Sequence, residues 1–224
     1  MTRIPKFGFS AFLRIICANE KPQKRLIKER HKPSEGGYDF HKSLRRLIQK
    51  LTVGELTTPN DIAMYVAGIT QAAERKSVSK GIKTFREWYE KNAMPLRGVG
   101  PMVFSSPNNH YQVNFTADFI TEIDGRNTAV HVWNTNSNLN RNLVIATLTI
   151  VAKSWPVTQT RPSDYAVLSL KTGDLLKWSD ASTEHKMLGE RLMLHIERLC
   201  VLARKELGLP AIYPSKESPG PEPK

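Results

Sequence analysis

The spacing of the apolar residues changes near residue 100, and this change constrains the fold more than any other feature of the sequence. Before it, apolar side chains recur at helical spacing, as in the segment from Tyr38 to Leu51. After it, apolar and polar residues alternate from Tyr111 to Ala117, as in a strand with one buried face. A chain that combines both patterns is expected to form an α/β structure.

The first hundred residues are predicted to be helical. The third of four expected helices has the clearest start signal, with Thr58 as N-cap, Pro59 in the first helical position and Asp61 completing a capping box. Pro33 and the Gly36-Gly37 pair separate the first two helices. The expected helices span about residues 9–30, 38–51, 58–75 and 79–92.

Two hairpins and two further helices are predicted after residue 100. The Asp124-Gly125 turn joins a strand over 111–123 to one over 128–135, and the turn at 171–174 joins strands at 165–170 and 175–178. A short strand is expected at 103–105. The segment 138–155 is long enough for a helix, although its β-branched residues favour a strand. The last helix, over 181–207, is apolar over a wide arc, which suits a core helix or a partner interface, with the core favoured.

The expected fold is therefore α/β, with a small mixed β-sheet flanked by helices and a helical N-terminal half. Length and composition indicate a single domain over residues 1–213, made of a basic helical part at 1–100 and the hairpins and helices at 101–213. The Pro/Ser/Lys/Glu-rich tail at 214–224 is predicted to be disordered.

The location is predicted from the cysteines and from apolar run lengths. Cys17 and Cys200 form no CxxC or Cys/His pattern, which predicts neither a disulfide nor a zinc site and fits a reducing, cytoplasmic location. No apolar run approaches the roughly 20 residues of a membrane span, so no membrane partner is expected. Residues 1–18 lack acidic side chains, as in an organellar transit peptide, but Arg14 interrupts their apolar run and an amphipathic first helix explains them equally well.

Positive charge is concentrated in the first half of the chain. The net charge is +12, of which residues 1–100 carry +11 (20 basic minus 9 acidic side chains). Such a stripe can neutralise phosphates, so nucleic acid is the expected partner, with DNA favoured over RNA. A solvated helix face on a basic protein is the alternative. The candidate phosphate-binding residues are Lys21, Lys24, Arg25, Lys28, Arg30, Lys42, Arg45 and Arg46.

Linear motifs for other chemistries are absent from the sequence, which contains no P-loop, GxGxxG, GxSxG or HExxH pattern. Asp118, Glu122 and Asp124 lie at even spacing in the first hairpin strand, so they would share one face. Carboxylates grouped in this way can hold a divalent cation. A solvated strand end beside a turn is the alternative.

Three segments carry a resemblance to a known family. They are Gly36-Gly37-Tyr38-Asp39-Phe40-His41-Lys42-Ser43-Leu44, Phe115-Thr116-Ala117-Asp118-Phe119, and Ala129-Val130-His131-Val132-Trp133-Asn134-Thr135. In this order they resemble the RecB-type branch of the PD-(D/E)XK nuclease superfamily. The likeness covers about residues 9–207, because residues 9–13 resemble its first helix and 165–178 its closing hairpin. The resemblance implies a restriction-endonuclease-like fold.

The departures from the family pattern bear on activity. The resemblance implies that His41 and Asp118 correspond to metal ligands, but Val132 stands at the third-motif carboxylate and Asn134 at the lysine. Asn142 and Ala146 replace the glutamine and tyrosine of the following helix. One imidazole and one carboxylate hold a hard cation poorly, and no ammonium remains to stabilise the developing charge. His41 and Asp118 are therefore expected to be vestigial, and no cofactor is expected.

We therefore expect a non-catalytic pseudo-nuclease that binds nucleic acid, or a structural subunit of a nucleic-acid-processing complex. One alternative is an enzyme, a Mg²⁺- or Mn²⁺-dependent nuclease in which Glu122 or Asp124 supplies a carboxylate and Lys153 or Arg141 a cation. Its metal would be held in part by His41 and Asp118. The other alternative is a protein-interaction subunit whose basic half binds an acidic partner.

Overall fold

The computed structural model describes residues 4–32, 40–92, 94–95 and 100–212. The expected tail at 214–224 and the Gly36-Gly37 pair lie outside the described residues. The elements in chain order are β1 (Lys6–Gly8), α1 (Phe9–Ile16), α2 (Glu20–His31), α3 (Lys42–Thr52), α4 (Pro59–Ala67), α5 (Ala72–Asn92), β2 (Met94–Pro95), β3 (Met102–Ser105), β4 (Gln112–Phe115), β5 (Phe119–Ile123), β6 (Arg126–Trp133), α6 (Arg141–Lys153), β7 (Asp164–Ser169), β8 (Leu175–Lys177), the 3₁₀ helix Trp178–Asp180, and α7 (Thr183–Glu206).

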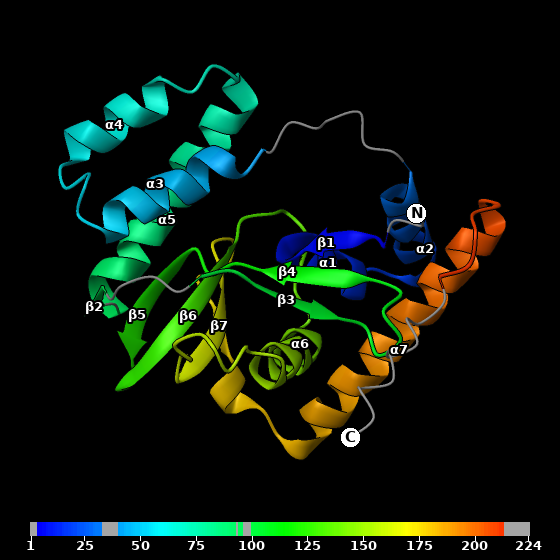
Figure 1. The fold of residues 1–224 in the computed structure, drawn as a ribbon. Coiled ribbons are helices and arrows are strands. Elements are labelled where there is room, and N and C mark those ends of the chain that lie inside the picture. The colour runs from blue at the N-terminus through cyan, green and yellow to red at the C-terminus, as the bar shows by residue number, and fades with distance from the viewer. Residues whose placement is uncertain (1–3, 33–39, 93, 96–99, 213–224) are drawn as a thin grey trace, which may run out of the picture.

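The strands form two mixed sheets, so the fold is mixed α/β as predicted. The larger sheet has the order β2-β5-β6-β7-β8, in which only β6 and β7 run parallel (Figure 1). Helix α6 makes the crossover that a parallel pair requires. The smaller sheet has the order β1-β4-β3, with β1 parallel and β3 antiparallel to β4.

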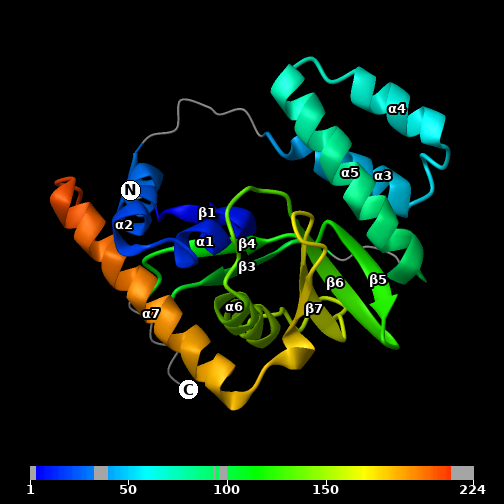
Figure 2. The same cartoon turned by 180° about the vertical axis from the view of Figure 1, so that it is seen from behind.

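Strands β6 and β7 are buried on both faces. Ala129 and Trp133 belong to the core on the side of α6 and α7, whereas Val130 and Val132 belong to the core on the side of α3 and α5. Figure 2 shows the helices on both sides of these strands. Burial on two faces explains why the middle of each strand, Ala129–Trp133 in β6 apart from His131 and Tyr165–Leu168 in β7, is apolar at successive positions instead of alternating.

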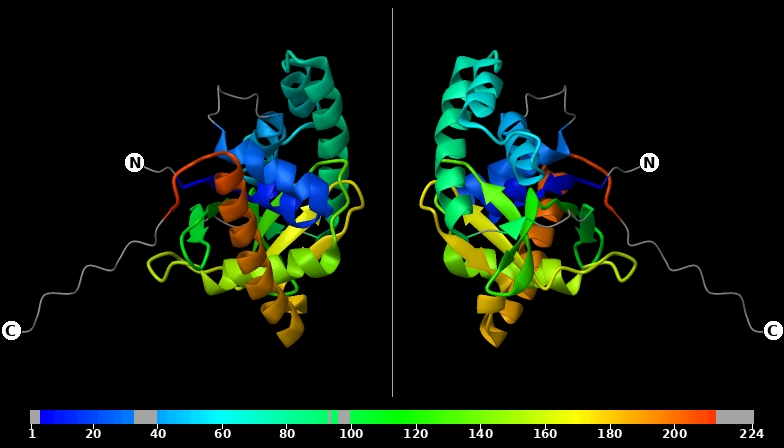
Figure 3. Two further views of the ribbon diagram at one scale, coloured as in Figure 1. Left: turned by 90° about the vertical axis from the view of Figure 1, so that its right-hand side faces the viewer. Right: turned by 90° about the vertical axis from the view of Figure 1, so that its left-hand side faces the viewer.

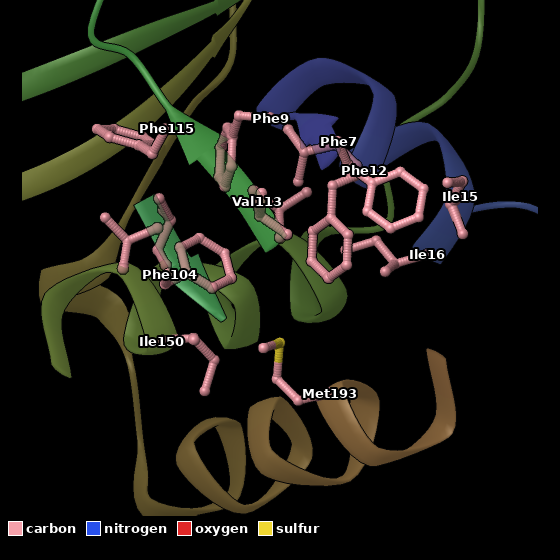
Figure 4. Close-up of a cluster of buried hydrophobic side chains, with 14 of the residues drawn as sticks. Phe7, Phe9, Phe12, Ile15, Ile16, Phe104, Val113, Phe115, Ile150 and Met193 are labelled. Atoms are coloured by element: carbon pink, nitrogen blue, oxygen red, sulfur yellow. The ribbon is translucent and has the colours of Figure 1, made fainter. Parts of the chain in front are cut away.

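The N-terminal residues belong to the larger core. Figure 4 shows Phe7, Phe9 and Phe12 packed against β3 and β4, with α6 and α7 beyond them. The ring centroids of Phe9 and Phe115 lie 4.8 Å apart in an edge-to-face arrangement, a geometry that favours aromatic pairs. The amphipathic first helix predicted from the sequence is therefore part of the folded core.

Helices α3, α4 and α5 form a second layer against the sheet, at the top of Figure 1. Phe85 of α5 is fully buried and packs edge-to-face on Phe119 of β5 at 5.3 Å. The predicted Thr58 capping box is confirmed, because the side chain of Thr58 accepts from Asp61 N and the carboxylate of Asp61 accepts from Thr58 N.

Helix α7 buries one face against α6 and α2, and α2 and α7 lie side by side in Figure 3. The side chains of Gln23 and His195 join these two helices at 2.9 Å. The core role favoured for this helix is confirmed for its inner face. Its outer face carries four exposed large apolar side chains, Met187, Leu194, Val201 and Leu202.

Local sequence signals placed most elements correctly. Both hairpin turns, the short strand predicted at 103–105 (β3 begins at Met102), α6 and α7 are confirmed, with Asn140 as the N-cap of α6 and Gly208 after α7 at φ 64°. Cys17 and Cys200 are both free thiols.

Two expected helix boundaries are wrong. The helix predicted over 9–30 is divided into α1 and α2, because the chain is extended at Asn19 and Pro22 occupies the first turn of the new helix, where proline is tolerated. The helix predicted over 58–75 ends at Ala67 with Gly68 as its C-cap, and α5 already begins at Ala72 rather than Ser79.

The strand predicted over 111–123 is also wrong, because it consists of two strands in different sheets. β4 ends at Phe115, and β5 begins at Phe119 after the chain has crossed to the larger sheet. Strands β1 and β2 were not predicted. They are three and two residues long, and their partners lie far away in sequence or beyond a loop, so no local periodicity marks them.

The close contact of α7 with α6 at Gly189 provides a test of the packing. A Cβ at this position would lie 2.6 Å from the Ala146 carbonyl oxygen and 2.9 Å from Thr149 Oγ1. We expect Gly189→Ala to lower the free energy of unfolding, because overpacking costs about 1–3 kcal/mol and exceeds the ~0.5–1 kcal/mol that alanine gains in a helix. Urea unfolding measures the change.

The exposed Arg191 on the same helix supplies the control. Arg191→Ala should alter stability by less than about 0.5 kcal/mol. A Gly189→Ala protein that is more stable than the wild type would contradict the close approach of the two helices.

Candidate functional site

One cleft lies where the first turn of α1, the start of α3 and the ends of β4 and β6 meet. Its volume is about 480 Å³. It brings together His41 and Asp118, the two residues that match the nuclease motifs. The charged and titratable residues that line it are Arg14, Arg30, His41, Arg45, Asp118 and His131.

Asp118 lies just before β5, and only 4% of it is exposed. Its Oδ2 accepts a hydrogen bond from the backbone N–H of Val132 at 2.7 Å, and its Oδ1 lies 3.7 Å from Arg45 Nε. Burial of a charge is unfavourable unless partners replace the lost water, and these two groups do so. Asp118 therefore links α3 to the strand pair β5–β6.

His131 is buried beside Asp118, in the middle of β6. Its Nδ1 lies 3.1 Å from the Thr116 carbonyl oxygen and 3.3 Å from Asp118 Oδ2, while its Nε2 lies 2.7 Å from Ser10 Oγ. Burial lowers the pKa of His131 below the usual range of histidine, although the carboxylate of Asp118 opposes this shift. The imidazole is therefore neutral at physiological pH.

The residues around Asp118 do not fit a divalent cation. Hard cations require several oxygen ligands, and no group of three or more His, Cys, Asp or Glu side chains capable of holding a metal occurs among the described residues. The one carboxylate in the cleft is already engaged by Val132 N and approached by the Arg45 guanidinium, which would repel a cation.

A second hollow of about 440 Å³ adjoins the cleft, and both are lined by His41 and Thr135. It lies between α5 and the loops after β6 and β7. Its cationic residues are Lys76 and Lys80 of α5 and Lys171 from the turn before β8. Among the described residues, the two hollows together carry three arginines and three lysines, against the single buried carboxylate of Asp118.

Three of the predicted basic residues of α2 form ion pairs instead of lining either hollow. Lys24 pairs with Glu20 at 2.7 Å, Arg25 lies 3.7 Å from Glu29, and Lys28 pairs with Glu206 of α7. Of the predicted set, only Arg30 and Arg45 line the cleft. Lys21, Lys42 and Arg46 are exposed outside both hollows.

The structure does not bring Glu122 or Asp124 to Asp118. Asp124 lies in the turn at the other end of β5, where it pairs with Lys177 at 2.7 Å and lines a different hollow. Glu122 is paired in register with Asn127 near the same end. The single strand face predicted for the three carboxylates is wrong, because only Glu122 lies within β5, whereas Asp118 precedes the strand and Asp124 follows it.

The two cations proposed to replace the family lysine are engaged elsewhere. Both lie on α6 and make ion pairs, Lys153 with Glu190 at 2.9 Å and Arg141 with Asp180 at 2.7 Å. Neither lines the cleft around Asp118.

Comparison with known proteins gives no assignment, because the sequence matches no protein-family model and no curated protein. Within the part of the chain that the structure describes, no helix has both the length and the apolar character to cross a bilayer.

Several residues of this site could not be identified from the sequence. Ser10, Arg14, Lys76, Lys80 and Lys171 were not predicted as site residues, and His131 was identified only as a member of a motif. Their contacts join segments far apart in the chain, such as Ser10 and His131, which are 121 residues apart. A signal was nevertheless present in Lys76 and Lys80, which are four apart on one helix face.

The buried neutral His131 predicts a pH dependence of stability. Its pKa is lower in the folded protein than in the unfolded chain, where it is about 6.5. The unfolded chain therefore takes up a proton first, and stability present above about pH 6.5 is lost as the pH falls. We expect the free energy of unfolding to fall between about pH 7 and pH 5.5, and His131→Gln to flatten this dependence by up to about 1.4 kcal/mol per pH unit.

Chemical unfolding at both pH values measures this effect. His31 contributes to the same slope, since burial also lowers its pKa, so the wild-type slope should not vanish in the variant. An unchanged slope in His131→Gln would show that His131 is not a buried neutral group.

Proposed function

We propose that this chain binds nucleic acid through the two adjoining hollows, defined here as the basic groove. The observation that supports this proposal is their charge, with six cationic side chains and one buried carboxylate. Each cation that neutralises a phosphate releases a counterion, which favours binding whatever the base sequence. In this proposal DNA is favoured over RNA.

The course of the groove supports a polymeric anion over a small one. It begins at Arg14 and Arg30 on α1 and α2, passes Arg45 on α3, and continues to Lys80 on α5 and Lys171 beyond β7. These residues come from five separate elements or turns. A backbone with regularly spaced phosphates can contact all of them, and such contacts position a nucleic acid without reading its sequence.

The arrangement around Asp118 supports the likeness to a degenerate PD-(D/E)XK nuclease. Asp118 hydrogen-bonds the backbone of Val132, the position that the resemblance gives to the second carboxylate. His41 lines the same cleft, and α6 leads from β6 into the parallel strand β7, as the predicted order requires.

The side chains at the family's catalytic positions argue against metal-dependent cleavage. Val132 is 5% exposed within the apolar core, and the side chain of Asn134 donates to Ser77 Oγ at 3.3 Å. Neither supplies a carboxylate or an ammonium to the cleft. We therefore infer a pseudo-nuclease that binds nucleic acid without this chemistry, alone or as a subunit of a processing complex.

Charge reversal in the groove provides the test. We expect Lys76→Glu/Lys80→Glu to weaken binding of labelled single-stranded and duplex oligonucleotides similarly for all sequences. The slope of log K against log salt should decrease by about 1.8 for duplex DNA, because each lost phosphate contact contributes about 0.9. Fluorescence anisotropy across a salt series measures both effects. Arg45 is unsuitable here, since its loss would leave Asp118 buried without that partner.

The matched control changes the net charge equally on the other side of the molecule. Lys186→Glu/Arg191→Glu alters two exposed residues of α7 that line neither hollow. This variant should keep most of the affinity and the full salt slope. If both variants lost the same affinity for oligonucleotides, binding would depend on net charge and not on the groove. If the wild-type protein bound no oligonucleotide at low salt, the groove would instead be expected to bind an acidic protein partner.

A further inference from the structure

Ser10, His131 and Asp118 lie next to one another in the cleft, and the ring of His131 hydrogen-bonds Ser10 on one side and the Thr116 carbonyl oxygen on the other. Ser10 Oγ lies 2.7 Å from His131 Nε2, and His131 Nδ1 lies 3.3 Å from Asp118 Oδ2. A nucleophile within hydrogen-bond reach of a base, which is itself oriented by a third group, is the general geometry of nucleophilic catalysis. The three residues come from α1, β6 and the segment before β5, so the fold brings them together.

The contacts of His131 determine where its proton lies. Nδ1 faces two oxygens that can only accept, the Thr116 carbonyl at 3.1 Å and the carboxylate of Asp118. The neutral ring must therefore carry its hydrogen on Nδ1, which leaves the lone pair of Nε2 for Ser10. The Ser10 hydroxyl donates to Nε2, as a serine nucleophile donates to its general base.

Access and burial differ among the three residues in the way this chemistry requires. His131 and Asp118 are each 4% exposed, whereas Ser10 is partly exposed and lines the cleft. Water that is excluded from the base cannot compete for its lone pair, while a ligand in the cleft can reach the hydroxyl.

The first turn of α1 supplies a second element of the site. Gly8 to Ala11 line the cleft, and the N-cap Gly8 makes no side-chain capping bond. The first N–H groups of a helix have no acceptor within the helix, and they favour negative charge. Ser10 therefore lies next to donors that can stabilise an oxyanion.

We propose that Ser10 is the nucleophile of an ester-hydrolysing site in which His131 is the general base, the Thr116 carbonyl orients its ring, and the nearby carboxylate of Asp118 stabilises the imidazolium that forms. The substrate class is a carboxylic ester that bears an anionic substituent, because Arg14 and Arg30 line the same cleft. This inference goes beyond the proposed binding of nucleic acid and does not rest on it.

The reaction proceeds in two balanced steps. Ser10 Oγ bonds to the ester carbonyl carbon while its proton moves to His131 Nε2. The bond to the alcohol oxygen then breaks, and the alcohol leaves with that proton. In the second step a water molecule gives a proton to His131 and attacks the acyl group, and Ser10 leaves and recovers its proton. The net reaction converts one ester and one water molecule into a carboxylic acid and an alcohol.

A serine-directed fluorophosphonate tests the nucleophile in the unmodified protein. Ser10 Oγ displaces fluoride from phosphorus and the adduct remains, so intact-mass measurement gives the stoichiometry and peptide mapping the site. We expect one adduct per chain, located on Ser10, and none in Ser10→Ala. His131→Gln should label at least about 100-fold more slowly, because a general base contributes about 10²–10⁴-fold.

A second serine–histidine pair in the same chain is the matched control. Ser182 Oγ lies 2.9 Å from His185 Nδ1 in the capping box of α7, with no buried carboxylate on that imidazole and outside the cleft. Ser182 should stay unlabelled, and Ser182→Ala should label like the wild type. Labelling of both serines, or of neither in the folded wild-type protein, would overturn the proposal.

Substrate charge is tested by hydrolysis of 4-nitrophenyl acetate and mono-4-nitrophenyl succinate. We expect the anionic ester to have the higher kcat/KM, and Arg14→Gln/Arg30→Gln to remove this preference while both esters are still hydrolysed. Equal rates in the wild type would contradict the anionic substrate class. Oligonucleotide binding without labelling of Ser10 would reject this proposal alone, whereas labelling without such binding would reject only the proposed function.

Discussion

The burial of β6 and β7 on both faces is the constraint on which the rest of the structure depends. One face is covered by α6, α7 and the smaller sheet, the other by α3 and α5, so two cores meet at a single pair of parallel strands. Both cores include residues of these strands, and a parallel pair of this kind requires a crossover, which α6 provides. The cleft lies where β6 leaves this doubly covered region, with Trp133 still buried and Thr135 already lining the opening.

Asp118 has a structural function whether or not it takes part in chemistry. A buried carboxylate costs several kcal/mol in desolvation unless partners compensate, and here Val132 N, Arg45 and the neutral His131 are its neighbours. Arg45 supplies positive charge beside this carboxylate. Asp118 thereby links α3 to the sheet.

The sequence predicted those parts of the fold whose signals are local. The Asp124-Gly125 turn, the Thr58 capping box and the length of 138–155 each depend on neighbouring residues, and the corresponding elements were correct. Errors occurred where distant partners decide. The break between β4 and β5 depends on two sheets that the alternating pattern cannot distinguish, and β1 is a strand only because residues 112–114 lie beside it.

Distant partners also decide which residues form the candidate site. Net charge predicted a basic surface, and the pairs of Lys24 with Glu20 and of Arg25 with Glu29 are local i,i+4 contacts within α2. The pair of Lys28 with Glu206 and the contribution of Lys171 arise from the tertiary structure.

Binding of an anion and activation of Ser10 make different demands on one cleft. The arginines attract phosphate or carboxylate groups from solution, and their effect is weakened by salt. The hydrogen bonds of His131 are buried and are far less screened, so the state of the Ser10 hydroxyl is insensitive to salt. Arg45 contributes to both properties, since it faces the cleft and lies beside Asp118. Its positive charge disfavours protonation of His131 while the Asp118 carboxylate favours it. Burial has the largest influence on this imidazole and lowers its pKa, so His131 is neutral and able to accept a proton in the same cleft that the arginines make attractive to anions.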